Sequence, residues 1–127
     1  MNPLPEHWLR FAREDLRMAE LAFEDEIYNQ TCFHAHQAIE KALKACLEAE
    51  GKLPPRTHKI ADLIARVRGL SLSDLEGKSL RMDRFDIPPR YPDALPGMLP
   101  EGWPGRAEAL EALDRAREAL RRVEALR

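Results

Sequence analysis

Apolar residues recur at helical spacing along nearly the whole chain, and no stretch shows the strict alternation typical of a strand. The pattern predicts a first helix over residues 5–26, with Pro5 tolerated in the first turn because that amide needs no intrahelical partner. Its inward face is expected to comprise Trp8, Phe11, Ala12, Ala19, Ala22 and Phe23. Asp15 falls in the middle of that arc, where a carboxylate must find a partner or lose its charge.

A second helix is predicted over residues 29–50, ending at Gly51 because the following "KLPP" prevents continuation. Small side chains line one edge of it, and they would let another helix approach closely. These are Ala35, Ala38, Ala42, Ala45 and Ala49. A third helix is expected to start near Thr57, a plausible N-cap, and to continue through "HKIADLIARVR".

The remainder of the chain predicts a shorter helix over residues 73–84 and an amphipathic last helix over residues 106–127. Between them, "FDIPPRYPDALPGMLPEGWPG" (85–105) holds six of the ten prolines and cannot be regular structure. The predicted fold is all-α: one domain over residues 1–127, an antiparallel up-and-down bundle of four to five helices with a long Pro-rich loop before the last helix.

Composition fits a globular chain, with 44% hydrophobic and 33% charged residues among 127, and a net charge of −2 gives no overall attraction to nucleic acid. No apolar run suits a membrane span, and the start lacks the layout of a signal peptide, so a cytoplasmic location and no membrane contact are expected. Cys32 and Cys46 read as core fillers. No metal ligand set and no cofactor motif is found.

A polar stripe runs along the second helix, whose stretch "CFHAHQAIEKALKAC" otherwise reads as buried. It consists of His36, Gln37, Glu40 and Lys44. One interpretation is a structural network, in which Glu40 and Lys44 form a favourable i,i+4 pair and Asp15 joins from the first helix, pairing with Lys44. The other interpretation gives Lys44 or His36 to a ligand.

Two further stretches carry candidate ligand residues. Arg56, His58 and Lys59 surround a helix start within residues 52–68, which hold a local excess of four positive charges, so a phosphate would be favoured there. Farther on, Arg84 and Arg90 flank a turn in which Pro92 holds Tyr91 extended, a layout that presents a guanidinium and a phenol together. The alternatives are a solvated basic face and a loop that packs on the bundle.

Three stretches carry a resemblance to a known family: "WLRFAREDLRMAELAF", the following "CFHAHQAIEKALKACLEAEGKLPPRTHKIADLI" and the later "RFDIPPRYPD". Through them, the chain resembles the HEPN domain family over roughly residues 8–126. The resemblance implies a helical bundle that forms a homodimer. It also implies a partner, a small nucleotidyltransferase, often in a toxin–antitoxin-like pair. Many catalytic relatives are metal-independent ribonucleases in which four to six residues separate an arginine from a following histidine, a pairing suited to proton transfer and phosphate charge stabilisation.

This chain departs from that motif, because no arginine stands at the required distance before His34, His36 or His58. We therefore expect a non-catalytic module that dimerises and binds the partner nucleotidyltransferase, a nucleotide, or both. The nucleotide or phosphate candidates are Arg56, His58, Lys59, Arg84, Arg90 and Tyr91. One alternative is a ribonuclease, and thus an RNA-binding protein, with a rearranged site using His58 and Arg90. Another is a dimerisation scaffold without a ligand.

Overall fold

A computed structural model describes residues 2–57, 59–72, 74 and 103–126 of the chain. Its helices are α1 (Glu6–Glu24), α2 (Tyr28–Ala49), α3 (Ile60–Arg66) and α5 (Arg106–Glu124). All regular elements in these ranges are helical, which confirms the predicted all-α class. Apart from residue 74, the predicted helix over 73–84 lies outside the described residues, as does nearly all of the Pro-rich segment.

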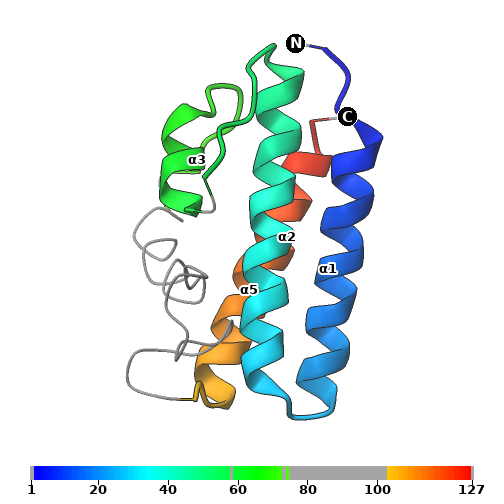
Figure 1. Ribbon diagram of the computed structural model, residues 1–127, viewed down its shortest axis with the longest axis vertical. Helices are drawn as coiled ribbons and strands as arrows, with labels where there is room; N and C mark the ends of the chain where they lie inside the picture. Colours follow the sequence, from blue (N-terminus) through cyan, green and yellow to red (C-terminus); the bar gives the residue numbers. More distant parts are fainter. Residues whose placement is uncertain (1, 58, 73, 75–102, 127) are drawn as a thin grey trace.

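Helix α2 forms the centre of the bundle and contacts α1, α3 and α5 (Figure 1). Helices α1 and α2 run antiparallel and are joined by a short turn, in which the Ile27 N–H donates to the Ala22 carbonyl at 2.8 Å. The predicted alanine edge of α2 is buried throughout, with each side chain at most 1% exposed. These small residues leave room for the helices on both sides of α2.

The core gathers large apolar side chains from all four described helices. Those that are fully buried include Leu9, Leu43, Leu63, Leu113 and Val123. The predicted inward face of α1 needs one correction, because Phe11 is 50% exposed while Leu9 is fully buried. The buried face centres on Leu9, Ala12 and Ala19, and Phe11 lies about 100° around the helix from Ala12.

The ends of α1 and α2 agree with the predictions to within one or two residues, and Gly51 follows α2 with a φ of +78°, as a helix-ending glycine does. Helix α3 is shorter than predicted. Thr57 precedes the helix instead of capping it: its hydroxyl accepts the Lys59 N–H at 3.1 Å and donates to Asp62. At its other end, α3 stops because Val67 is extended, with ψ 130°. No helix in the described part of the chain is long and apolar enough to cross a membrane.

Candidate ligand-binding cavity between α1, α2 and the linker

Polar side chains meet along the seam between α1 and α2 at two levels. Trp8 of α1 contacts Glu48 of α2, and Asp15 contacts Lys41. Trp8 and Asp15 are seven residues apart on α1, and Lys41 and Glu48 are seven residues apart on α2. Because seven residues return to nearly the same face of a helix, the two contacts lie one above the other on a single seam.

The first level, halfway along the two helices, is a cluster of Asp15, His34 and Lys41, here called the central polar cluster. Oδ1 of Asp15 lies 3.0 Å from Nδ1 of His34, and the Lys41 ammonium donates to Oδ2. The Asp15 side chain is 14% exposed. Burial alone would raise the pKa of its carboxyl, but the hydrogen bonds from His34 and Lys41 outweigh burial and hold that pKa below its usual value.

The partner of Asp15 is thus Lys41 rather than the predicted Lys44. The physical reason is azimuth: His34 and Lys41 share one face of α2, whereas Lys44 lies about 60° away from Lys41 around the helix. Lys44 instead donates to Glu40 at 2.8 Å, the predicted i,i+4 pair, with both side chains almost buried. In the same stripe, His36 is buried and Gln37 is half-buried.

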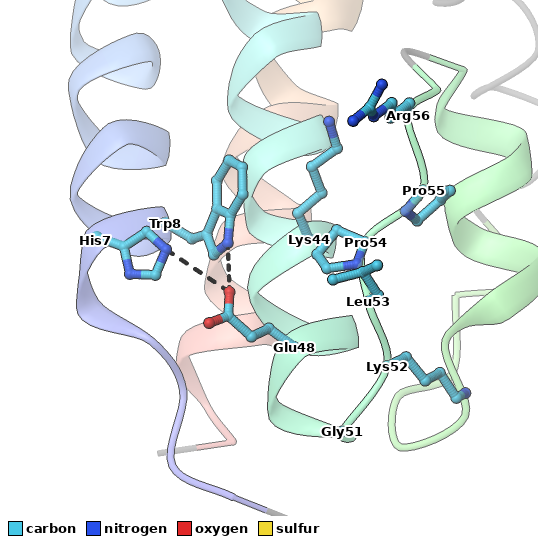
Figure 2. A pocket seen from close by; sticks show the side chains of 10 residues that line it. All are labelled: His7, Trp8, Lys44, Glu48, Gly51, Lys52, Leu53, Pro54, Pro55 and Arg56. Atoms are coloured by element: carbon cyan, nitrogen blue, oxygen red, sulfur yellow. Dashed lines mark hydrogen bonds and ion pairs between the residues drawn. The ribbon is translucent and has the colours of Figure 1, made fainter.

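A cavity of about 860 Å³ opens at the end level of the seam, between the start of α1, the end of α2 and the linker to α3 (Figure 2). Its lining consists of His7, Trp8, Lys44, Glu48, Gly51, Lys52, Leu53, Pro54, Pro55 and Arg56. The lining therefore combines an indole ring, two proline rings and three side chains that are cationic at neutral pH, against a single carboxylate.

The indole of Trp8 is held by its edge. Its Nε1–H donates to Oε2 of Glu48 at 2.6 Å, and Nε2 of His7 lies 3.7 Å from the same oxygen (Figure 2). The ammonium of Lys44 lies over the ring, 5.7 Å from its centroid, at a distance suited to a cation–π contact. Glu48 thus positions a flat aromatic group in the cavity.

The three cations of the cavity differ in what they already bind. Lys44 is paired with Glu40, and Lys52 donates to Glu50 and to the carbonyl of Arg66. Arg56 is exposed and makes no hydrogen bond or ion pair with any part of the chain that the structure describes. Figure 2 shows the head groups of Lys44 and Arg56 extending toward the same end of the cavity. That end is a place where an anion would meet two positive charges.

The linker that forms one wall is tied to the bundle on both sides. The Glu50 carboxylate accepts the backbone N–H groups of Arg68 and Gly69, the latter at 2.9 Å, and also binds Lys52. Burial would raise the pKa of Glu50, but the hydrogen bonds from Lys52, Gly69 and Arg68 lower it below its usual value. This clamp, consisting of Glu50 and Lys52, holds the linker and the end of α3 against α2.

The predicted ligand residues are only partly brought together. Arg56 lines the cavity, whereas Lys59 is exposed at the N-cap position of α3 and is not part of the lining. His58, Arg84, Arg90 and Tyr91 lie outside the described residues, so the anion site at the third helix start, the arginine–tyrosine turn and the rearranged ribonuclease site stay predictions.

Sequence reasoning missed two residues of the cavity and two of the central polar cluster. It read Trp8 as a plain core residue and overlooked Glu48, His34 and Lys41. A signal for them was present: Trp8 and Asp15 on the first helix, and Lys41 and Glu48 on the second, share a spacing of seven and match in antiparallel order.

Other candidate chemistry in the described residues is weak. Cys32 and Cys46 are buried free thiols, and burial raises the pKa of each to about 12, so they stay protonated and act as core side chains. Within the ranges that the structure covers, His, Cys, Asp and Glu side chains form no group of three that would hold a metal ion.

Comparisons with known proteins agree with the helical architecture. The HEPN domain family model matches residues 5–126, which confirms the resemblance read from the sequence. TT1696 from Thermus thermophilus has a crystal structure with 37% identity and a TM-score of 0.79, covering 98% of each chain. The crystal structure of ST0689, an archaeal HEPN homologue, has 27% identity and a TM-score of 0.75, covering 99% of this chain and 98% of that one. No curated protein matches the sequence.

Proposed function

We propose that this chain, which belongs to the HEPN domain family, is a binding module that takes a nucleotide in the cavity between α1, α2 and the linker. The observation that carries the proposal is the pairing of an oriented indole, Trp8, with the cationic head groups of Lys44 and Arg56 in one cavity. A nucleotide has the two matching parts: a flat base and a phosphate.

The energetics favour this class of ligand over a plain anion or a plain apolar molecule. A base gains about 1–3 kcal/mol from stacking on an aromatic side chain. A guanidinium such as that of Arg56 binds phosphate through two parallel hydrogen bonds, which are stronger than those between neutral groups. A volume of about 860 Å³ lies within the ~300–1,000 Å³ of small-molecule sites.

The test is isothermal titration calorimetry of the purified chain with AMP, GMP, CMP and UMP. At least one should bind with a Kd below about 1 mM, and Arg56→Ala should weaken it about tenfold because the phosphate loses its paired hydrogen bonds. Arg17→Ala is the matched control, since Arg17 is exposed on α1 outside the cavity lining, and it should bind as the wild type does. If no nucleotide binds, or both variants weaken binding equally, the proposal fails.

We further propose that the chain forms a homodimer through α1. Three large apolar side chains on this helix are exposed at 43–50%: Phe11, Met18 and Leu21. Positions 11 and 18 are seven residues apart and 21 follows three later, a spacing typical of a helix face that packs on another helix. Light scattering after size exclusion should give a dimer for the wild type and a monomer for Met18→Lys. Trp103→Ser, at an exposed site off α1, should stay dimeric.

A partner nucleotidyltransferase is the third part of the proposal, in a toxin–antitoxin-like pair in the cytoplasm. Its support is family membership. Affinity purification of the tagged chain from its native cells, followed by mass spectrometry, should recover a small nucleotidyltransferase in stoichiometric amount. Recovery of the homodimer alone would count against a stable partner and leave nucleotide binding by the isolated chain as the function to pursue.

A further inference from the structure

Glu48 is the one carboxylate in the cavity lining, and only one of its two oxygens is used. Oε2 accepts the Trp8 Nε1–H at 2.6 Å and faces Nε2 of His7 at 3.7 Å. Oε1 accepts no hydrogen bond from the residues that the structure describes, and the side chain is 43% exposed. Glu48 is therefore a fixed acceptor, oriented at one oxygen and open at the other.

Glu48 lies at the opposite end of the cavity from the cationic head groups of Lys44 and Arg56 (Figure 2). In Figure 2, the Glu48 carboxylate lies at the lower edge of the indole, while Lys44 and Arg56 extend their head groups toward the other end. Pro54 and Leu53 of the linker form the wall across from Trp8. A nucleotide with its phosphate near Arg56 and its base along the indole would present the edge of that base to Glu48.

We propose that Glu48 reads the base of the bound nucleotide and that the site prefers guanine. The inference rests on the proposed function. An ionised carboxylate only accepts hydrogen bonds. Guanine offers two adjacent donors on its pairing edge, N1–H and the 2-amino group, which a carboxylate binds together. Each carboxylate oxygen has two lone pairs, so the Trp8 bond to Oε2 does not block this arrangement.

The other bases fit this acceptor less well. Adenine and cytosine each offer one amino group beside a ring nitrogen that is itself an acceptor, and uracil places its single N–H between two carbonyl oxygens. The lone pairs of those acceptors would face the negative charge of Glu48. Polar sites that are matched to a donor reject analogues that lack it, because a group is then left unpaired. Glu48 would thus set specificity, while Arg56 and Trp8 supply affinity.

The experiment compares GMP, IMP, AMP and UMP by calorimetry. IMP is the sharpest probe because it lacks only the 2-amino group of GMP. The wild type should bind GMP about tenfold more tightly than IMP, with AMP and UMP no tighter than IMP. Glu48→Gln keeps an acceptor for Trp8 but places an amide N–H₂ at the second position, so it should reduce the GMP-to-IMP ratio toward one. Glu14→Gln, on the exposed side of α1, should leave the ratio unchanged.

The outcomes separate the two proposals. If all four nucleotides bind the wild type alike, or Glu48→Gln keeps the full preference for GMP, the assignment to Glu48 is overturned and nucleotide binding stands. If no nucleotide binds, nucleotide binding is overturned and the base assignment falls with it. Far-UV circular dichroism and the thermal midpoint of Glu48→Gln should match the wild type, which ties a change in preference to the base contact.

Discussion

The central polar cluster and the Trp8–Glu48 contact lie on the same α1/α2 seam, yet they differ in how completely their carboxylates are paired and in how exposed they are. In the cluster, both oxygens of Asp15 are bound, one to His34 and one to Lys41, and each side chain is at most 25% exposed. At the end level, Glu48 is 43% exposed and uses one oxygen, beside an open cavity. Complete pairing at Asp15 favours stability, whereas the unpaired oxygen of Glu48 beside a cavity leaves an acceptor available for the proposed ligand.

Asp15→Ala should give the largest effect. It leaves His34 and Lys41 without their shared carboxylate, so we expect the free energy of unfolding to fall by about 2 kcal/mol, less than for a fully buried pair because all three groups keep some solvent contact. Urea denaturation measures this. The matched control is Glu14→Ala, which removes an exposed partner of Arg10 and should cost ~0.5 kcal/mol or less. Equal losses would show that the cluster is not a special source of stability.

Trp8→Leu tests the other level of the seam. It keeps an apolar side chain but removes the flat ring and the donor to Glu48, so nucleotide affinity should fall about tenfold, or ~1.4 kcal/mol. Calorimetry with the tightest-binding nucleotide gives the value. Trp103→Leu alters a tryptophan that is 67% exposed and outside the cavity lining, and should leave affinity unchanged. Unchanged binding by Trp8→Leu would place the base elsewhere.

Acid should lower the free energy of unfolding by protonating the paired carboxylates of Asp15 and Glu50. The pKa values of Asp15 and Glu50 are lowered in the folded chain, so the unfolded chain takes up protons at a higher pH than the folded chain does. Their contribution is fully present above the unfolded pKa values, about 4, and is lost as pH falls through the folded ones. Urea denaturation should show a steeper fall below pH 4 for the wild type than for Asp15→Asn. Parallel curves would mean that Asp15 carries no pH-dependent stability.

Leu53→Ala should have the smallest effect on folding. This side chain is 92% exposed on the linker, so its truncation should change the free energy of unfolding by less than ~0.5 kcal/mol. Because Leu53 lines the cavity, nucleotide affinity should still fall, by about twofold on the apolar contact alone. If Leu53→Ala lowered the free energy of unfolding more than Asp15→Ala does, the linker rather than the central polar cluster would be the main source of stability.

Most of the fold could be predicted because it follows from periodicity. The buried alanine edge of α2, the apolar face of α5 and the stop at Gly51 are all set by local spacing and glycine geometry. Local rules misjudged Thr57, which was predicted as the N-cap although Lys59 occupies that position. Beyond the end of α3 at Val67, the backbone N–H of Arg68 donates to Glu50, eighteen residues earlier, and no local pattern reveals such a contact.

The site was harder to predict because it depends on which faces meet. Arg56 was identified from the basic stretch alone, since charge can be counted without a fold. Glu48 reads as an ordinary solvent-facing residue on a helix wheel, and its role appears only when Trp8 lies opposite it. The same holds for Asp15, whose need for a cation was clear but whose choice of Lys41 over Lys44 depends on the crossing of two helices.

The clamp of Glu50 and Lys52 bears on how the linker tolerates substitution. Because the chain is fastened at residues 50–52 and again at 66–69, we expect substitutions at the three residues Leu53–Pro55 to leave the helices that carry Trp8 and Glu48 in place. If the cavity binds a nucleotide as proposed, substitutions in this short stretch would change ligand preference while Trp8 and Glu48 stay in place. For protein engineering, these three positions are where a library of substitutions would reshape selectivity at the least risk to folding.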